Sequence, residues 1–325
     1  MPVLSVVIPF LNESGSAARM GDFLRQLETE IGQRFGLTLE TVLVDDGSRD
    51  DSIAQYRRHL TGNWKIAELS RNFGKEIALF AGLEQTSGDY VMMIDADLQH
   101  PYSVCLQLIE ELIGDPSLDV VYTVRDDRKQ ESFKKDMGSR LFYWLINFQQ
   151  RYAVPENAGD FRIMRRAVRD ALVTVRDRRR FNKGLYAWTG FRQKGIPYTP
   201  DERIGSASRW SRLSLIGLSV EGITSFSVIP LRIFSILGVL TGVCGLIYGA
   251  KILLEVLFYG VSVPGYPSLM VAVAVFGGFN LALLGLIGEY LWVGISETKD
   301  RPLYILRGIH RPATAAETGE GDPAP

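Results

Sequence analysis

The chain has 325 residues, with 36 basic and 37 acidic side chains, so its formal net charge is only −1. A balance this close to zero excludes a general affinity for nucleic acid, and any polyanion must therefore be bound by local groups. The two cysteines, Cys105 and Cys244, lie far apart, which argues against a disulfide framework. The length is sufficient for one large domain or two small ones with a real core.

Up to about residue 200, short apolar segments alternate with amphipathic ones. We predict strands over 4–9, 41–44, 66–69, 90–94 and 119–124, and helices over 14–35, 75–85 and 101–113. Strands rich in Val and Ile that alternate with helices are typical of a largely parallel sheet covered by helices. The fold class predicted for residues 1–205 is therefore α/β.

The rest of the chain is more apolar. Residues 231–254 and 268–292 contain uncharged stretches long enough to cross ~30 Å of hydrocarbon, and we predict two transmembrane helices there. A pair of buried core helices is the alternative. Glycines recur in both stretches, which suits close helix packing in lipid and predicts a homo-oligomer.

The distribution of Lys and Arg predicts an orientation in the membrane. The linker over 255–267 has neither residue, whereas Arg and Lys flank the two stretches on their other sides. Positively charged flanks stay in the cytoplasm, so we place both termini and the soluble part there, in a multi-pass inner-membrane protein. Residues 206–230 are predicted to form amphipathic helices at the membrane interface, or else helices that face a core. Residues 293–325 are predicted as a cytoplasmic tail, disordered after Arg311.

Polar residues follow four of the predicted strands, at 9–13, 45–48, 72–75 and 95–99. In a parallel sheet these strand ends meet at one edge, where open α/β folds bind ligands. The edge would gather four carboxylates that repel one another unless a divalent cation compensates them: Glu13, Asp46, Asp95 and Asp97. For the last two, the alternative is a helix cap and a solvated charge. No glycine-rich phosphate loop is present, so phosphate charge would be met by the metal and by arginines.

These motifs together resemble family 2 glycosyltransferases of the GT-A fold. The matching residues are Ser5-Val6-Val7-Ile8-Pro9 with Asn12-Glu13, Asp45-Asp46-Gly47-Ser48, Asn72 with Gly74, Asp95-Ala96-Asp97-Leu98-Gln99, and Gly159-Asp160-Phe161-Arg162. With two C-terminal spans, the order of motifs resembles the polyisoprenyl-phosphate branch, which includes bactoprenol glucosyltransferases and dolichol-phosphate mannose synthase-like enzymes.

The resemblance implies a role for each matching residue. A nucleotide sugar would be bound by Pro9, Leu11, Glu13, Val44, Asp46, Ile94, Asp95, Arg125, Arg203 and Arg209. Mg²⁺ or Mn²⁺ would be held by Asp95, Asp97 and Gln99. Asp160 matches the family position proposed as base, or it orients a substrate; a turn Asp that caps a helix is the alternative. Arg162 and Arg209 are candidates for the acceptor phosphate.

The predicted function is inverting transfer of a sugar, with UDP-glucose as first choice of donor, to undecaprenyl phosphate at the cytoplasmic membrane face. One alternative is a processive polysaccharide synthase, although Ser206 stands where such enzymes carry Gln before Arg209-Trp210. The other alternative is a non-enzymatic, membrane-anchored protein that binds nucleotide sugars.

Overall fold

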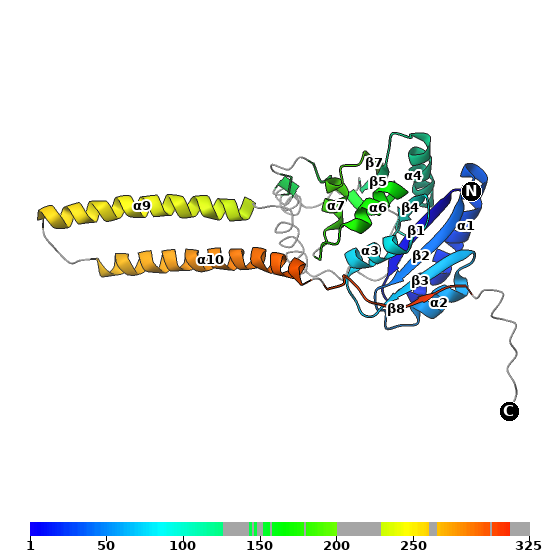
Figure 1. Ribbon diagram of the computed structural model, residues 1–325, viewed down its shortest axis with the longest axis horizontal. Helices are drawn as coiled ribbons and strands as arrows, with labels where there is room; N and C mark the ends of the chain where they lie inside the picture. The colour runs from blue at the N-terminus through cyan, green and yellow to red at the C-terminus, as the bar shows by residue number, and fades with distance from the viewer. Residues whose placement is uncertain are drawn as a thin grey trace, which may run out of the picture. The chain divides into compact units, whose positions relative to one another are not determined.

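The computed structural model describes residues 1–125, 143–144, 146–147, 152–156, 158–178, 180–199, 229–259, 265–299 and 301–312. The chain divides into two compact units. One is built around a β-sheet, and the other contains two long helices (Figure 1).

In its described part, the first unit has one sheet in the order β7-β5-β6-β4-β1-β2-β3-β8. The strands are β1 (Val3–Phe10), β2 (Thr38–Asp45), β3 (Asn63–Leu69), β4 (Tyr90–Met93), β5 (Val120–Arg125), β6 (Ala158–Arg165), β7 (Gln193–Tyr198) and β8 (Leu306–His310). β1 pairs in parallel with β2 and β4, β2 with β3, and β5 with β7. Only β6 and β8 run against their neighbours. The predicted, mostly parallel α/β sheet is confirmed.

Helices cover both faces of this sheet. The helices are α1 (Ala17–Phe35), α2 (Ser52–His59), α3 (Lys75–Gln85), α4 (Tyr102–Gly114), α6 (Arg166–Thr174) and α7 (Asn182–Trp188). α1, α2 and α4 share one core with the side chains of Leu4, Val6 and Ile8. α3 packs on the other face, where its alanines meet Val44 of β2. The predicted helix over 75–85 is confirmed. The one over 14–35 begins as a 3₁₀ turn and becomes α-helical at Ala17.

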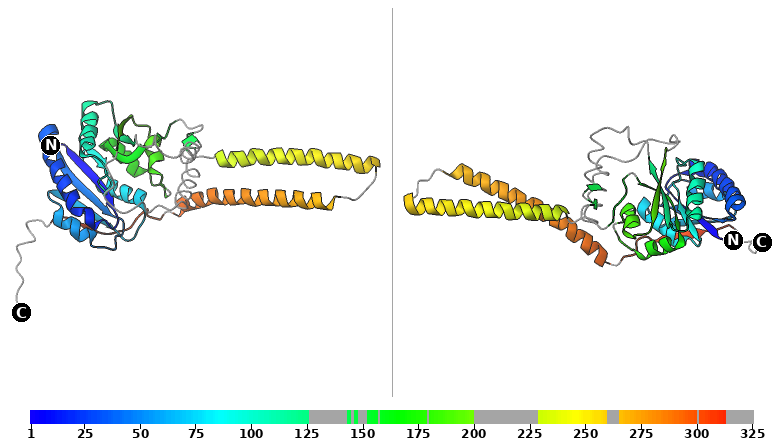
Figure 2. Two further views of the ribbon diagram at one scale, coloured as in Figure 1. Left: turned by 180° about the vertical axis from the view of Figure 1, so that it is seen from behind. Right: turned by 90° about the horizontal axis from the view of Figure 1, so that it is seen from above.

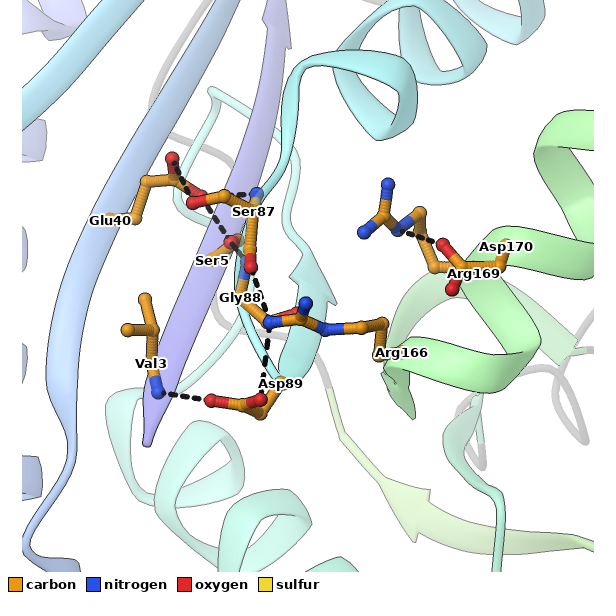
Figure 3. Close-up of polar contacts among 9 residues, drawn as sticks. All are labelled: Val3, Ser5, Glu40, Ser87, Gly88, Asp89, Arg166, Arg169 and Asp170. Atoms are coloured by element: carbon orange, nitrogen blue, oxygen red, sulfur yellow. Dashed lines mark hydrogen bonds and ion pairs between the residues drawn. The ribbon is translucent and has the colours of Figure 1, made fainter. Parts of the chain in front are cut away.

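A buried carboxylate fastens the amino ends of the strands (Figure 3). Glu40 on β2 accepts a hydrogen bond from Ser5 Oγ on β1, and others from the backbone N–H (2.8 Å) and Oγ (2.9 Å) of Ser87. It also pairs with Lys65 Nζ on β3 at 2.9 Å. Three neighbouring strands and the turn before β4 are thus joined at the edge opposite the predicted site.

The C-terminal segment differs from the prediction. It was expected to be a tail, but β8 pairs antiparallel with β3 and becomes the last strand of the sheet (Figure 1). Arg307 and His310 contact Glu68 of β3 at 2.9 and 3.1 Å, and Tyr304 donates to Glu84 of α3 at 2.5 Å. β3 would otherwise expose a row of unpaired backbone groups, and covering such an edge is favourable. The remainder of the predicted tail, from residue 313, lies outside the described residues.

The second unit contains α9 (Ile229–Tyr259) and α10 (Tyr266–Thr298), which run in opposite directions (Figures 1 and 2). The rings of Phe234 and Phe279 stack between them at 5.7 Å. Many apolar side chains point to the exterior; Leu257 and Leu281, for example, are 70% and 71% exposed. In the described residues, one stretch, Val275–Trp292, is long and apolar enough to cross a membrane, and Leu231–Gly245 is apolar but shorter. The span predicted over 231–254, and with it the pair of transmembrane helices, therefore stays a prediction. The interfacial segment up to residue 228 lies outside the described residues.

Candidate active site

The loops after β1 and β2 are tied together at the carboxyl edge of the sheet. Asn12 adopts a left-handed conformation (φ 53°), donates its backbone N–H to Ser48 Oγ at 2.9 Å and accepts from the backbone N–H of Arg49 at 2.8 Å. Asn tolerates this conformation because its short side chain can bond locally. Ser52 Oγ then accepts from the backbone N–H of Glu13 at 2.8 Å.

The β2 loop is equally fixed to the turn that precedes α3. Both oxygens of Asp46 are occupied, by the backbone N–H groups of Phe73 (2.7 Å) and Gly74 (3.0 Å). Burial raises the pKa of Asp46, against the effect of these two bonds. Gly47 has φ 77°, and a Cβ there would lie 2.5 Å from the carbonyl carbon of Arg71, so only glycine fits. Asp46 thus positions the start of α3.

A strained turn follows β4. Leu98 has φ 53°, a left-handed conformation that is costly for a leucine and that tends to occur at functional sites. This turn brings the backbone N–H of Gln99 to Asp97 Oδ1 at 3.3 Å. Among the described residues, no cation contacts the carboxylate of Asp97. The turn therefore leaves a negative charge open at the edge of the sheet.

Asp95 and Asp160 meet through a lysine. β6 pairs antiparallel with β4, with Met93 opposite Arg162, and the same register carried two residues further sets Asp95 opposite Asp160. Lys75 Nζ, at the first residue of α3, lies 2.7 Å from Asp95 Oδ1 and 3.2 Å from Asp160 Oδ2. Burial alone would raise the pKa of Asp95, but the charges of Lys75 and His100 outweigh it and hold that pKa well below its usual range.

His100 supports Asp95 from the other side. Its ring stacks on Phe161 with centroids 4.1 Å apart, and its Nε2 lies 3.7 Å from Asp95 Oδ2. That distance is too long for a hydrogen bond. Neither ring nitrogen has a hydrogen-bond partner among the residues that the structure describes, although only 9% of His100 is exposed to water. A buried imidazole without partners is unusual in a purely structural setting.

Arg162 lies beneath the edge and is only 2% exposed. Its guanidinium sits 3.5 Å from the ring centroid of Tyr186 on α7 and donates to the carbonyl oxygen of Gly159 at 2.8 Å. Burial lowers the pKa of Arg162, while the charge of Asp160 opposes this shift. An acceptor phosphate, the predicted ligand of Arg162, does not reach a side chain so placed without rearrangement. Nearby, burial and the charge of Asp160 raise the pKa of Glu76 to about 7.

The structure thus gathers part of the predicted set. Asp95 and Asp160 share one cation, and Asp97 and Gln99 share one turn. Val44 and Ile94 are buried, with 0% and 1% exposure. The remaining members lie on or just after β1 (Pro9, Leu11, Glu13), at the end of β5 (Arg125), or outside the described residues (Arg203, Arg209).

Sequence reasoning assigned no role to Lys75, Glu76, His100 or Tyr186. Lys75 is the last residue of the polar segment 72–75, and His100 directly follows the segment 95–99; these positions were the available signal. Tyr186 lies in a segment, 183–188, that resembles the bactoprenol branch, and it reaches the site because α7 packs against β6.

The donor set fits a hard divalent cation that keeps positions for a ligand's oxygens. Among the described residues, no three His, Cys, Asp or Glu side chains form a group that could hold a metal by itself. Mg²⁺, however, commonly uses one or two carboxylates together with substrate phosphates. Asp97 is open for this purpose, whereas Asp95 is shared with Lys75.

An α/β sheet with carboxylates at its carboxyl edge beside a strained turn is the arrangement expected of the GT-A fold class. Residues 5–173 match the model of glycosyl transferase family 2, and the chain belongs to that family. It is 39% identical to an uncharacterised glycosyltransferase of Synechocystis over 94% of this chain and 95% of that protein. It is 35% identical to the prophage bactoprenol glucosyl transferase homologue of Escherichia coli K12 (95% and 99% covered) and to the bactoprenol glucosyl transferase of Shigella phage SfII (95% and 98%).

Proposed function

We propose that this glycosyltransferase moves one sugar from a nucleotide sugar, with UDP-glucose as first choice, to a polyisoprenyl phosphate such as undecaprenyl phosphate. One observation carries the proposal. The similarity to the bactoprenol glucosyl transferase of Shigella phage SfII covers 98% of that protein, so it extends beyond the residues of the family model into the region of the two long helices. Bactoprenol is a polyisoprenyl alcohol, and its phosphate is the acceptor that we propose.

The residues around β4 position the side chains at the carboxyl edge of the sheet, where the nucleotide sugar would bind. Lys75 and His100 hold Asp95 between them, and the turn at Leu98 sets Asp97 and Gln99 at the edge. Asp95, Asp97 and Gln99 would hold Mg²⁺ or Mn²⁺, which as a Lewis acid neutralises charge on the leaving nucleoside diphosphate. The base and ribose would lie over the β1 and β2 loops near Pro9, Leu11 and Glu13, with Arg125, Arg203 and Arg209 available for the diphosphate.

Attack by a phosphate requires little help from a base. The second pKa of a phosphate monoester is near ~6, so the acceptor oxygen is already an anion at neutral pH. Asp160 would then orient the acceptor or the sugar. Its Oδ1 is buried and has no hydrogen-bond partner among the described residues, so it can accept a hydrogen bond from a hydroxyl. Direct displacement at the anomeric carbon inverts its configuration.

The long helices would place this chemistry at a membrane. We propose that both α9 and α10 cross the bilayer, with the termini and the active site in the cytoplasm. The exposed apolar side chains of both helices support this arrangement. In a Cys244→Ser background, Ser262→Cys in the linker should react with a membrane-impermeant thiol reagent from outside intact cells. Reaction only in opened cells would contradict the topology.

The activity is tested with purified full-length chain in detergent, undecaprenyl phosphate, Mg²⁺ or Mn²⁺ and labelled UDP- and GDP-sugars. We expect a lipid-linked product carrying a single sugar, and none when undecaprenol replaces its phosphate. Asp97→Asn should abolish turnover, whereas Asp22→Asn, on an exposed helix face, should not. A lipid-linked polymer would indicate a processive synthase, and no product from any donor would refute the enzyme.

A further inference from the structure

The ammonium of Lys75 occupies the centre of the candidate site. It bridges Asp95, which follows β4, and Asp160, on β6, at 2.7 and 3.2 Å. An ordinary lysine is cationic at physiological pH, so Lys75 places a positive charge between the two carboxylates.

A purely structural ion pair does not account for this arrangement. The side chain of Lys75 is 42% exposed, so part of it faces solvent. An ammonium has three protons, and the two contacts use two of them. Asp160 Oδ1, beside it, has no hydrogen-bond partner in the described part of the chain. An unused donor next to an unused acceptor suits a ligand that offers both, such as a phosphorylated sugar.

Neither Asp95 nor Asp160 has Lys75 as its sole positive or polar neighbour, so the ammonium is available to a ligand. The charge of Asp160 acts on the buried guanidinium of Arg162, and Asp95 has the His100 ring 3.7 Å away. Each carboxylate thus has another positive or polar neighbour, and neither depends on Lys75 alone.

Two buried arginines, Arg162 and Arg180, are poorly placed to bind a ligand. Arg162 is 2% exposed and lies over Tyr186. Arg180 is 6% exposed, donates to the carbonyl oxygen of Val175 and lies over Phe80, with its Nε 3.2 Å from Asn182 Oδ1. Compared with Arg162 and Arg180, Lys75 has the side chain that reaches solvent.

We propose that Lys75 is a phosphate-binding residue, whose ammonium contacts a phosphoryl oxygen of one of the two substrates. The inference rests on the proposed function, since it takes the substrates to be a nucleoside-diphosphate sugar and a polyisoprenyl phosphate. Either phosphate offers the same chemistry to an ammonium, so the experiment has one arm for each.

The test compares the affinity for a phosphate-bearing probe with that for its phosphate-free analogue. Calorimetry with full-length wild type and Lys75→Met would use UDP against uridine for the donor, and farnesyl phosphate against farnesol for the acceptor. Lys194→Met is the matched control, because Lys194 is a 49% exposed lysine that contacts Glu111 at 2.5 Å outside the site. If Lys75→Met does not fold, Lys75→Gln is measured in the same way.

We expect Kd to rise at least tenfold for UDP or for farnesyl phosphate, with the phosphate-free analogue within twofold and Lys194→Met unchanged. The arm that responds identifies which phosphate Lys75 contacts. Affinities that stay within twofold in both arms would overturn the proposal, and so would equal losses for a probe and its analogue, since these indicate an indirect effect. The binding measurements do not depend on turnover, so the two proposals can fail separately. If the wild type binds these probes but forms no product, the proposed function is refuted while the role of Lys75 stands.

Discussion

Glu40→Gln should destabilise the sheet unit by about 3 kcal/mol without touching the candidate site. Glu40 is only 2% exposed, and its carboxylate accepts three hydrogen bonds from Ser5 and Ser87 (Figure 3). It also contacts the ammonium of Lys65. The side-chain oxygen of a glutamine can accept about two of these contacts, but the negative charge is lost. Hydrogen bonds to charged groups contribute about 1.5–3 kcal/mol against about 1 for neutral ones, and breaking a buried pair costs about 3–5 kcal/mol, so about 3 kcal/mol is expected.

The effect should depend on pH in one direction. Burial by itself would raise the pKa of Glu40, but the bonds from Ser5, Lys65 and Ser87 outweigh it and lower the pKa below 4.5. A lowered pKa contributes stability that is present above the unfolded value and is lost as pH falls through the folded one. The difference between wild type and Glu40→Gln should therefore persist from pH 7 to about 5 and shrink below 4.5.

The assay is urea unfolding of the full chain in detergent, followed by tryptophan fluorescence, to which Trp64, 7% exposed on β3 beside β2, contributes. Glu111→Gln is the control, because its partner Lys194 is exposed and such a pair contributes at most about 1 kcal/mol. A loss below about 0.5 kcal/mol at pH 7, or a difference that is unchanged at pH 3.5, would refute the reasoning.

Three further outcomes are expected. The pKa of Glu76 is raised to about 7, so the folded state keeps a proton on this carboxyl that the unfolded state has already lost, and stability should fall as pH rises from about 5 to 8. In thermal melts, Glu76→Gln should flatten this slope. An unchanged slope would contradict the raised pKa of Glu76. Chelation by EDTA should remove transferase activity, and Mg²⁺ or Mn²⁺ should restore it. Asp97→Asn should lose about 100-fold or more of the activity and respond less to added metal, consistent with a Lewis-acid role of several kcal/mol for the metal. Full activity in EDTA would exclude this role. Tyr304→Phe removes the hydrogen bond to Glu84 and should cost about 1 kcal/mol or more, measured by urea unfolding, while a neutral result would mean that β8 is held by its backbone pairing alone.

The strands and the helix at 75–85 could be predicted because their signals are local. A run such as Tyr90–Met93 is apolar enough to indicate a buried strand on its own, and the carboxylates after it follow in the chain. The motifs also sufficed to identify the family. β8 could not be found in this way, since five residues with alternating exposure become a strand only when β3 offers an edge.

The sequence by itself therefore determined the α/β class, the family and the edge at which polar residues gather, because periodicity and strand-end motifs are properties of short segments. The tertiary structure alone decided how those residues meet. The antiparallel register of β6 against β4 brings Asp160 toward Asp95, and the start of α3 delivers Lys75 between them. The same register sends Arg162 beneath the edge, where burial removes it from a ligand's reach. Such contacts join residues that are up to 85 positions apart, as between Lys75 and Asp160, and no local pattern encodes them.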